Sequence, residues 1–493
     1  MARINTNVNA MIAQRILKTQ NSHVAMSLEK LSTGLAINKA SDKPDGLIAS
    51  ENLRAEETAI LAAISNGERT DHIVGIAEGG LIEIQDQLNV LLGLVTSASS
   101  RDSLSPTERE AVQLQIDGIL GSVDRIANQT SFQGVKLLNG NFEFMVSGLV
   151  ASHIDNLHVK AALLPEITDS SMTVNITVAE SAQTALAYIS TGGGVNNSTF
   201  SGQTVTFELT GSLGTTQFAF GSGTTATEAV SSINQFRDLT GVSASFSGTG
   251  VVVRSRKVGE HEFVAVRHVE GAAYEDRIHI DDGSNTAVQT TGVANGRDKG
   301  FDAVVVINGI QASAKGLTAK ISQPFFDLEF VVDSAHNTDG SSTSFVIKSG
   351  GAKFNLRQVA ELSSKQHIGL EAVTTGGLGS DGDGRLAALK SGGTANLVDG
   401  DYDRAQRIVT GAIKQIATQR GFLGSFSKNI VRTAINSLRI EYENTAAAES
   451  RIRDTDFATE TGSLTRRQIL SQAATNSLAI ANAQSQSALA LLG

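Results

Sequence analysis

The chain has 493 residues, which is longer than a single hydrophobic core usually organises. Because 40% of these residues are hydrophobic, several folded domains are expected. It contains no cysteine, which excludes disulfides, thiolate metal sites and cysteine nucleophiles. Its net charge of −10 argues against a nucleic-acid-binding protein, because such proteins carry basic surfaces.

The beginning of the chain, residues 1–7, is polar and lacks the apolar core of a signal peptide. Since no run of about 18 apolar residues occurs, membrane insertion is not expected. If the protein is extracellular, it leaves the cell by a route that needs no cleaved signal.

Residues 1 to about 130 are expected to be helical. The first helix carries a coiled-coil seam with spacings of seven, four, three and four. A turn at 41–46 follows, with the sequence SDKPDG. The seam consists of Leu17, Val24, Leu28, Leu31 and Leu35.

A second helix is predicted from Gly46 to Ser99, and it has the clearest pattern in the chain. Its apolar residues alternate in steps of three and four, so this rod must be covered by other helices. Ile60 and Ile64 extend the pattern toward the N-terminus. The seam consists of Val74, Ala77, Leu81, Ile84, Leu88, Leu91, Val95 and Ala98.

A third helix is predicted to begin at Ser105, with Pro106 in its first turn and Glu108 completing a capping box. Its expected buried face consists of Val112, Ile116, Ile119, Val123 and Ile126.

The middle of the chain, about 140–395, is rich in Gly, Ser, Thr and Val and alternates as strands do. Asn308-Gly309 predicts a hairpin turn. One short helix is expected, with one face formed by Ala226, Val230, Ile233 and Phe236. The expected inward-facing strand residues are Met172, Val174, Ile176 and Val178, then Val205, Phe207 and Leu209, then Phe326, Leu328, Phe330 and Val332.

Residues from about 400 to 493 are expected to be helical again. One seam is formed by Ala405, Val409, Ala412, Ile416, Leu423, Phe426 and Ile430. The last helix has no charge after Arg467 and many small residues, which suits close packing inside an assembly. Its apolar residues are Ile469, Leu470, Ala474, Leu478, Ala481, Ala488 and Leu492.

The fold class is therefore α plus β multidomain, with a long helical coiled-coil core formed by both chain ends and a β-rich (α+β) outer insert. We expect 1–44 and 455–493 to form an inner terminal coiled-coil domain. Residues 45–145 and 400–454 are expected to form a helical rod. Residues 146–399 are expected to form a surface-exposed insert, with one or two subdomains.

Both ends resemble bacterial flagellins through long motifs in matching order. The N-terminal motifs are INTN at 4–7, LSTGLAIN at 31–38, ASDKPDGL at 40–47 and NQTSFQGVKLL at 128–138. The C-terminal motifs are QRGFLG at 419–424, EYEN at 441–444, AESRIRD at 448–454, QIL at 468–470 and ANA at 481–483. Residues 203–270 more weakly resemble an α+β module of some flagellins and hook-associated proteins.

The resemblance implies a structural subunit that polymerises into the flagellar filament and serves motility. It implies secretion, unfolded, through flagellar type III export, and an extracellular place in the filament. The implied partners are further copies of the same chain, an export chaperone, and the filament cap and junction proteins. The alternative is a hook–filament junction protein, and an insert that displays an enzyme or binds a surface stays open as a third class.

The resemblance also implies that the terminal helices line the filament channel. It implies as well that the residues of the apolar seams serve in assembly and in the core. These are Leu17, Val24, Leu28, Leu31, Leu35, Val74, Leu81, Leu88, Val95, Leu470, Ala474, Leu478 and Ala481. Where many flagellins carry Arg and Glu that an innate-immune receptor reads, this chain has Val90, Leu92, Gly93 and Gln115. Weak recognition by that receptor is expected.

No catalytic residue, cofactor or metal site is expected, and the chain is not expected to be an enzyme. His261-Glu262 and His268 lack the spacing of a zinc-protease helix, in which the two histidines are four apart. Asp381 to Gly384 lacks the remaining ligands of a calcium loop. Gly192 to Gly194 lacks the Lys and Ser/Thr of a phosphate-binding loop.

Overall fold

The computed structural model describes most of the chain and divides it into two compact units. It describes residues 7–99, 105–164, 171–190, 199–200, 204–247, 250–270, 278–280, 295–323, 326–359, 361, 364–380, 382–398 and 401–490. Unit 1 comprises Met1–Asp71, Asn355–Ser364 and Phe426–Gly493. Unit 2 comprises His72–Phe354 and Lys365–Ser425.

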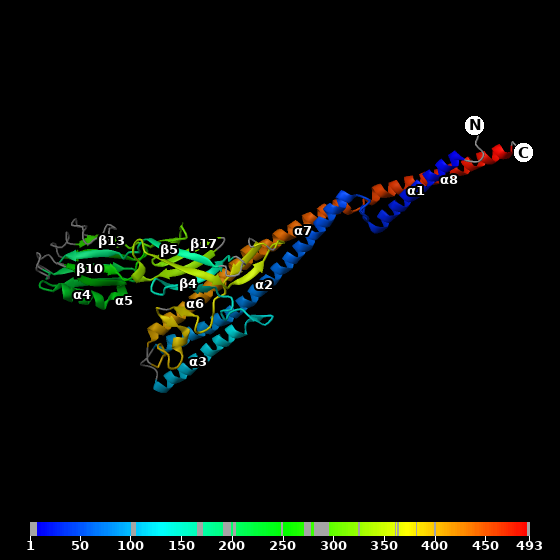
Figure 1. Ribbon diagram of the computed structural model, residues 1–493. Helices are drawn as coiled ribbons and strands as arrows, with labels where there is room; N and C mark the ends of the chain where they lie inside the picture. The colour runs from blue at the N-terminus through cyan, green and yellow to red at the C-terminus, as the bar shows by residue number, and fades with distance from the viewer. Residues whose placement is uncertain are drawn as a thin grey trace. The chain divides into compact units, whose positions relative to one another are not determined.

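Unit 1 brings the two ends of the chain together (Figure 1). Helix α1 (Val8–Thr33) lies beside α8 (Phe457–Ala490). The segment after α1 pairs with the segment before α8, since the Thr455 amide donates to the Gly34 carbonyl at 2.8 Å. Gly34 ends α1 in the left-handed conformation, with φ 76°. Leu35 therefore lies outside the helix, which corrects the predicted seam at its last position.

Helix α2 (Pro44–Ala98) carries the 3–4 seam that its sequence predicts. Every predicted position from Val74 to Ala98 is buried, and so is Ile60. Ile64 is only half-buried, and Ala63 takes its place because it continues the three-four rhythm. In unit 1, Ile60 and Ala63 pack with Leu438.

Helix α3 (Pro106–Gln129) begins with the predicted capping box. The Glu108 amide donates to Ser105 Oγ at 3.3 Å, and the Ser105 amide donates to Glu108 Oε2 at 2.7 Å. The predicted buried face is wrong at three of its five positions, because Val112, Ile119 and Ile126 are only half-buried. The observed buried face is turned by about one residue and consists of Gln113, Ile116, Leu120, Val123 and Ala127.

The C-terminal rod consists of α6 (Tyr402–Ser425), a π-helical turn (Phe426–Val431) and α7 (Arg432–Arg453). The predicted seam holds from Ala405 to Phe426 but is wrong at Ile430, which is 40% exposed. The π-helical turn adds one residue to the spacing, so Val431 becomes the buried residue instead.

The β-rich part of unit 2 contains two separate cores. The inner core lies between a five-stranded sheet, in the order β15-β14-β5-β19-β3, and a six-stranded sheet, in the order β16-β17-β18-β4-β21-β20. It is filled by residues such as Phe326, Phe330 and Phe345. The strands are β3 (Met145–Ser147), β4 (Ile154–Ala162), β5 (Met172–Glu180), β14 (Val304–Ile307), β15 (Ile310–Gln311), β16 (Ser313–Lys315), β17 (Thr318–Gln323), β18 (Phe326–Val332), β19 (Ser342–Ser349), β20 (Ala352–Asn355) and β21 (Lys365–Ile368).

The outer core lies in a module of two four-stranded sheets, β12-β6-β10-β9 and β13-β11-β7-β8, with helix α4 (Ala226–Gln235). A short helix, α5 (Arg237–Thr240), follows α4. Here Phe200, Phe207, Phe218 and Phe220 form an aromatic cluster. The strands are β6 (Leu186–Ser190), β7 (Val205–Gly211), β8 (Thr215–Phe220), β9 (Val242–Ser247), β10 (Gly250–Ser255), β11 (Phe263–Glu270), β12 (Ile278–Ile280) and β13 (Asn295–Lys299).

Local predictions in the insert hold with one correction. Asn308 and Gly309 have φ 48° and 83°, as a two-residue hairpin turn between β14 and β15 requires. In α4 the buried face is Ala226, Ala229 and Ile233, whereas Val230 is half-buried and Phe236 is exposed beyond the helix end.

The remaining elements are short. They are the paired strands β1 (Ser131–Phe132) and β2 (Val135–Lys136), the paired strands β22 (Gly379–Ser380) and β23 (Gly384–Arg385), and the 3₁₀ turns Ser334–His336 and Leu386–Leu389. Within the described residues, no helix combines the length and the apolarity of a membrane span.

Candidate assembly surface

Helices α1 and α8 run antiparallel and are joined by polar contacts along their length. At one end, Asn7 Nδ2 donates to the Ala481 carbonyl at 2.8 Å. In the middle, Ser471 Oγ donates to Asn21 Oδ1 at 2.7 Å. Further along, Arg467 Nη1 donates to Ser27 Oγ at 2.5 Å. These bonds fix the register of the two helices.

The interior of this helix pair contains small side chains. Its buried residues are Ala13, Ser27, Ala474 and Ala481. Large apolar side chains lie on its surface instead, such as Ile12 at 43% and Ile480 at 64% exposure. A self-sufficient coiled coil buries its large residues, whereas in the described part of this pair the fully covered positions are small.

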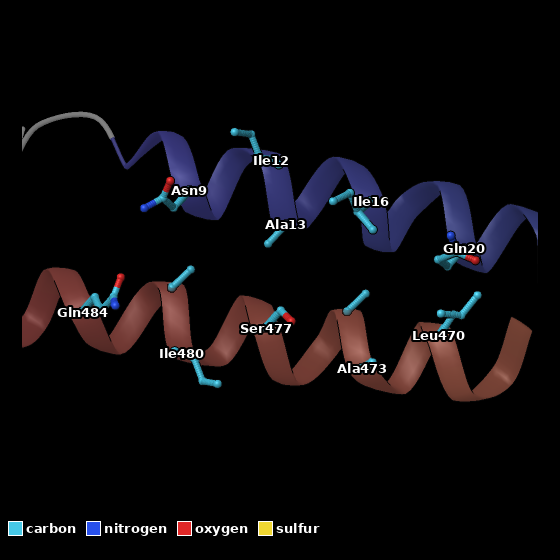
Figure 2. A pocket seen from close by; sticks show the side chains of 12 residues that line it. Asn9, Ile12, Ala13, Ile16, Gln20, Leu470, Ala473, Ser477, Ile480 and Gln484 are labelled. Atoms are coloured by element: carbon cyan, nitrogen blue, oxygen red, sulfur yellow. The ribbon is translucent and has the colours of Figure 1, made fainter.

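A groove of about 540 Å³ runs between the two helices. Figure 2 shows Ala13 and Ile16 pointing toward α8 and Leu470 pointing toward α1, while Ile12 and Ile480 point away from the pair. The groove is lined by Asn9, Ile12, Ala13, Ile16, Gln20, Leu470, Ala473, Ala474, Ser477, Ile480, Ala481 and Gln484. None of these residues carries a charge, so the groove suits another apolar surface rather than an ion.

The predicted seam residues of the two terminal helices occupy different environments. Ala474 and Ala481 are buried in the helix pair. Leu28 is 50% exposed and Leu470 is also exposed, so both are available to a partner. The others, Leu17, Val24, Leu31, Leu35 and Leu478, are half-buried.

The predicted rod residues Val74, Leu81, Leu88 and Val95 are fully buried in the subunit's own core. Because their side chains are already covered, they act as core residues and cannot contact a second copy in this fold. The sequence analysis placed them in one list of assembly and core residues, since periodicity alone does not distinguish the two roles.

Sequence reasoning missed Ile12, Ile16 and Ile480 of the groove. A seam search selects the large residues that a helix would bury, whereas these three are exposed, and Ile12 and Ile480 point away from the pair. For Ile480 the available signal was the absence of charge after Arg467, which the sequence analysis used only for the helix as a whole.

The segments with motif-like histidines and acids form ordinary structure where they are described. His268 lies in strand β11, as the alternation predicts, and not on a helix. Asp383 accepts from Arg407 Nε at 2.9 Å in a tight turn, while Asp381 and Gly192 to Gly194 lie outside the described residues. Among the described residues, no group of three or more metal-ligating side chains is close enough to hold an ion.

A buried 3–4 rod and a terminal helix pair with large apolar residues on its outside are features of a helical structural subunit. Comparison with known families agrees. The bacterial flagellin N-terminal helical region matches residues 4–143, and the bacterial flagellin C-terminal helical region matches residues 407–492. The chain belongs to the bacterial flagellins, the structural subunits of flagellar filaments.

The curated relatives match along their whole length. A flagellin of Salmonella rubislaw is 28% identical over 528 aligned positions, covering 99% of both chains. Flagellin A of Helicobacter pylori is 27% identical, again over 99% of both chains. These comparisons give no support to the hook–filament junction protein that the sequence left as the alternative.

Two solved structures of flagellar proteins are more distant. One is FliC from Burkholderia pseudomallei, with 13% identity, a TM-score of 0.23, and coverage of 73% of this chain and 99% of that one. The other is the D2–D3 part of the flagellar cap protein FliD from Serratia marcescens, with 15% identity, a TM-score of 0.24, and coverage of 36% of this chain and 92% of that one.

Proposed function

We propose that this flagellin polymerises through the α1–α8 surface, with neighbouring copies covering the groove and the outward-facing isoleucines. The observation that carries the proposal is that the buried residues of the pair include its alanines, while the large side chains of Ile12 and Ile480 are exposed. Burying apolar surface is the main favourable term in protein association. A second copy supplies apolar helices of the same composition.

The terminal helices depend on assembly for their full stability. A two-helix pair whose interior is alanine and serine buries little apolar surface, and isolated helices are marginal in water. We therefore propose that α1 and α8 exchange amide hydrogens rapidly in the monomer and slowly in the filament. Full amide protection of both helices in the free monomer would contradict this part of the proposal.

Repeated contacts of this kind build a filament when the contact surfaces on one copy differ from each other. Heterologous head-to-tail contacts do not close on themselves and generate an open helical polymer. The proposed division of labour is that residues 1–44 and 455–493 assemble, 45–145 and 400–454 form the rod, and 146–399 faces solvent. In this proposal the chain is secreted, extracellular and has no enzymatic activity.

Partners other than the chain itself follow from family membership. We propose that an export chaperone, the filament cap and the junction proteins bind this flagellin. We also propose weak recognition by the innate-immune flagellin receptor, because Val90, Gly93 and Gln115 are exposed on the rod where charged side chains would be read. A receptor reporter that responds as strongly as to a standard agonist flagellin would refute this.

The direct test replaces Ile480 by Asp, since this side chain is exposed and points away from α1. The variant monomer is expected to keep its helicity and solubility, whereas adding short filament seeds should produce no long filaments by electron microscopy. The matched control is Leu213→Asp, which changes a side chain of 67% exposure in the outer module. Normal filaments from Ile480→Asp, or their loss in both variants, would overturn the assignment of this surface.

A further inference from the structure

A strap formed by residues 369–380 connects the six-stranded sheet of unit 2 to its helices. On the sheet side, the Gly369 amide donates to the Lys160 carbonyl of β4 at 2.7 Å. On the helix side, Gln415 of α6 exchanges two hydrogen bonds with the Gly379 backbone, at 2.7 and 2.8 Å. The strap thus bonds to β4 at one end and to α6 at the other.

Glu371 is the residue of the strap that contacts both sides. Its Oε1 lies 2.8 Å from Nδ1 of His158 on β4. Its backbone carbonyl accepts from Gln419 Nε2 of α6 at 3.4 Å. Both side chains of the His158–Glu371 pair are less than one-third exposed, at 28% and 29%. Glu371 thus connects the strap to β4 through its side chain and to α6 through its backbone.

The pair borders two cavities. His158 and Glu371 line a cavity of about 210 Å³ on one side, which α6 borders with Lys414 and Phe422. They also line a second cavity of about 440 Å³, which Glu143 borders. Because water enters cavities with several polar partners, proton exchange with His158 is possible without unfolding.

The charges around His158 favour its protonated form. Burial lowers the pKa of His158, but the hydrogen bond and the charge of Glu371 outweigh burial, so this pKa stands above its ordinary value. Glu329 on β18 acts in the same direction, and Lys160 on β4 acts against it. Burial, followed by the charge of Glu371, raises the pKa of Glu143.

We propose that His158 and Glu371 form a proton-operated latch that fastens the strap to β4 when His158 is charged and releases it when His158 is neutral. Loss of the proton leaves Glu371 facing the carboxylate of Glu143 without the charge of His158 to offset it. The opposing cations that face the group are Lys160 and, more distantly, Arg385, Lys320 and Lys414.

The linkage between protonation and folding determines the direction in which pH acts on the latch. Since the folded-state pKa of His158 is raised, its contribution is fully present below the unfolded-state pKa and is lost as pH rises through the folded-state pKa. Glu143 acts in the same sense, because its raised pKa favours the neutral form that a rising pH removes. Alkaline conditions therefore open the latch, and mildly acidic conditions close it.

Hydrogen exchange of the full-length chain tests the opening. The reporters are the amides of Gly369, Leu370 and Val373, which donate to the Lys160, Phe142 and Leu138 carbonyls. After correction for the intrinsic rate, their protection is expected to fall on the order of tenfold between about pH 6 and about pH 9. His158→Gln should remove this pH dependence, whereas His261→Gln, at an exposed site in the outer module, should retain it.

An NMR titration of His158 distinguishes a latch from a merely structural contact. In Glu371→Gln the pKa of His158 is expected to fall to its ordinary value or below, because the amide retains a hydrogen-bonding group but removes the negative charge. An unchanged His158 pKa in that variant would overturn the proposal. So would strap protection that does not depend on pH in the wild type, or an unchanged pH dependence in His158→Gln.

Discussion

Ile430 and Val431 are neighbours in the chain, yet only Val431 enters the core of the C-terminal rod. Val431 is fully buried, whereas Ile430 is 40% exposed. Regular α-helix after Phe426 would bury Ile430 and then Thr433 and Ser437 at the next seam positions. The π-helical turn Phe426–Val431 instead brings Ile435 and Leu438 into the core.

A pair of aspartate substitutions tests this register. Val431→Asp is expected to destabilise the helical transition by about 3–5 kcal/mol, because an unpaired carboxylate enters the core. Ile430→Asp should change it by no more than about 0.5 kcal/mol, since the side chain faces solvent. Thermal unfolding followed by far-ultraviolet circular dichroism measures both. The reverse order of effects would mean that the rod has no π-helical turn in solution.

Truncation of a seam residue tests the core of the N-terminal rod. Leu88→Ala is expected to cost about 2–5 kcal/mol, because Leu88 is completely buried and its removal leaves a cavity. Leu114→Ala is the matched control, since Leu114 is 70% exposed on α3. Chemical denaturation gives the two costs, and equal values would contradict the assignment of the α2 seam to the subunit's own core.

A buried glutamine on α3 holds the segment that precedes the C-terminal rod. Gln113 Nε2 donates to the Leu389 carbonyl at 2.8 Å, and Gln113 Oε1 accepts from the Leu397 amide at 3.0 Å. Gln113→Ala is expected to cost about 1–3 kcal/mol, because it leaves two buried backbone groups without partners. Faster proteolysis within 389–397 would report it. Gln115→Ala, at an exposed site two residues further on, should have no such effect.

Acid is expected to loosen the contact between α3 and the strap. Burial opposes ionisation of Asp124, but hydrogen bonds from Thr375 and Lys390 outweigh it and hold the pKa of that carboxyl below its usual value. Asp124 therefore contributes stability above its unfolded-state pKa, and this contribution is lost as pH falls through the folded-state pKa. Melting temperatures across the acid range should fall less steeply in Asp124→Asn than in the wild type. A parallel fall in both proteins would exclude this role.

Much of the helical architecture could be predicted from the sequence because its signal is local. The α2 seam repeats in steps of three and four, so each residue confirms the phase set by its neighbours. The capping box at Ser105 and Glu108 and the turn at Asn308-Gly309 are also encoded within a few residues. Family membership followed from motifs at both ends.

The errors have a common physical origin, which is that contacts from distant segments decide burial. The α3 face turned toward Gln113 because backbone groups at 389 and 397 required a polar partner. The outward position of Ile12 and Ile480 depends on the antiparallel register of α1 and α8. Asn7 and Arg467 fix this register through hydrogen bonds between residues near opposite ends of the sequence.

The sequence by itself determined the helical ends, the β-rich insert between them and the membership of the flagellin family, because periodicity and motifs are properties of short stretches of chain. Only the tertiary structure decided which apolar residues are core and which remain for assembly, since that depends on what covers each side chain. The same holds for the His158–Glu371 pair, whose members are 213 residues apart. Their shared proton chemistry exists only because the strap returns to β4.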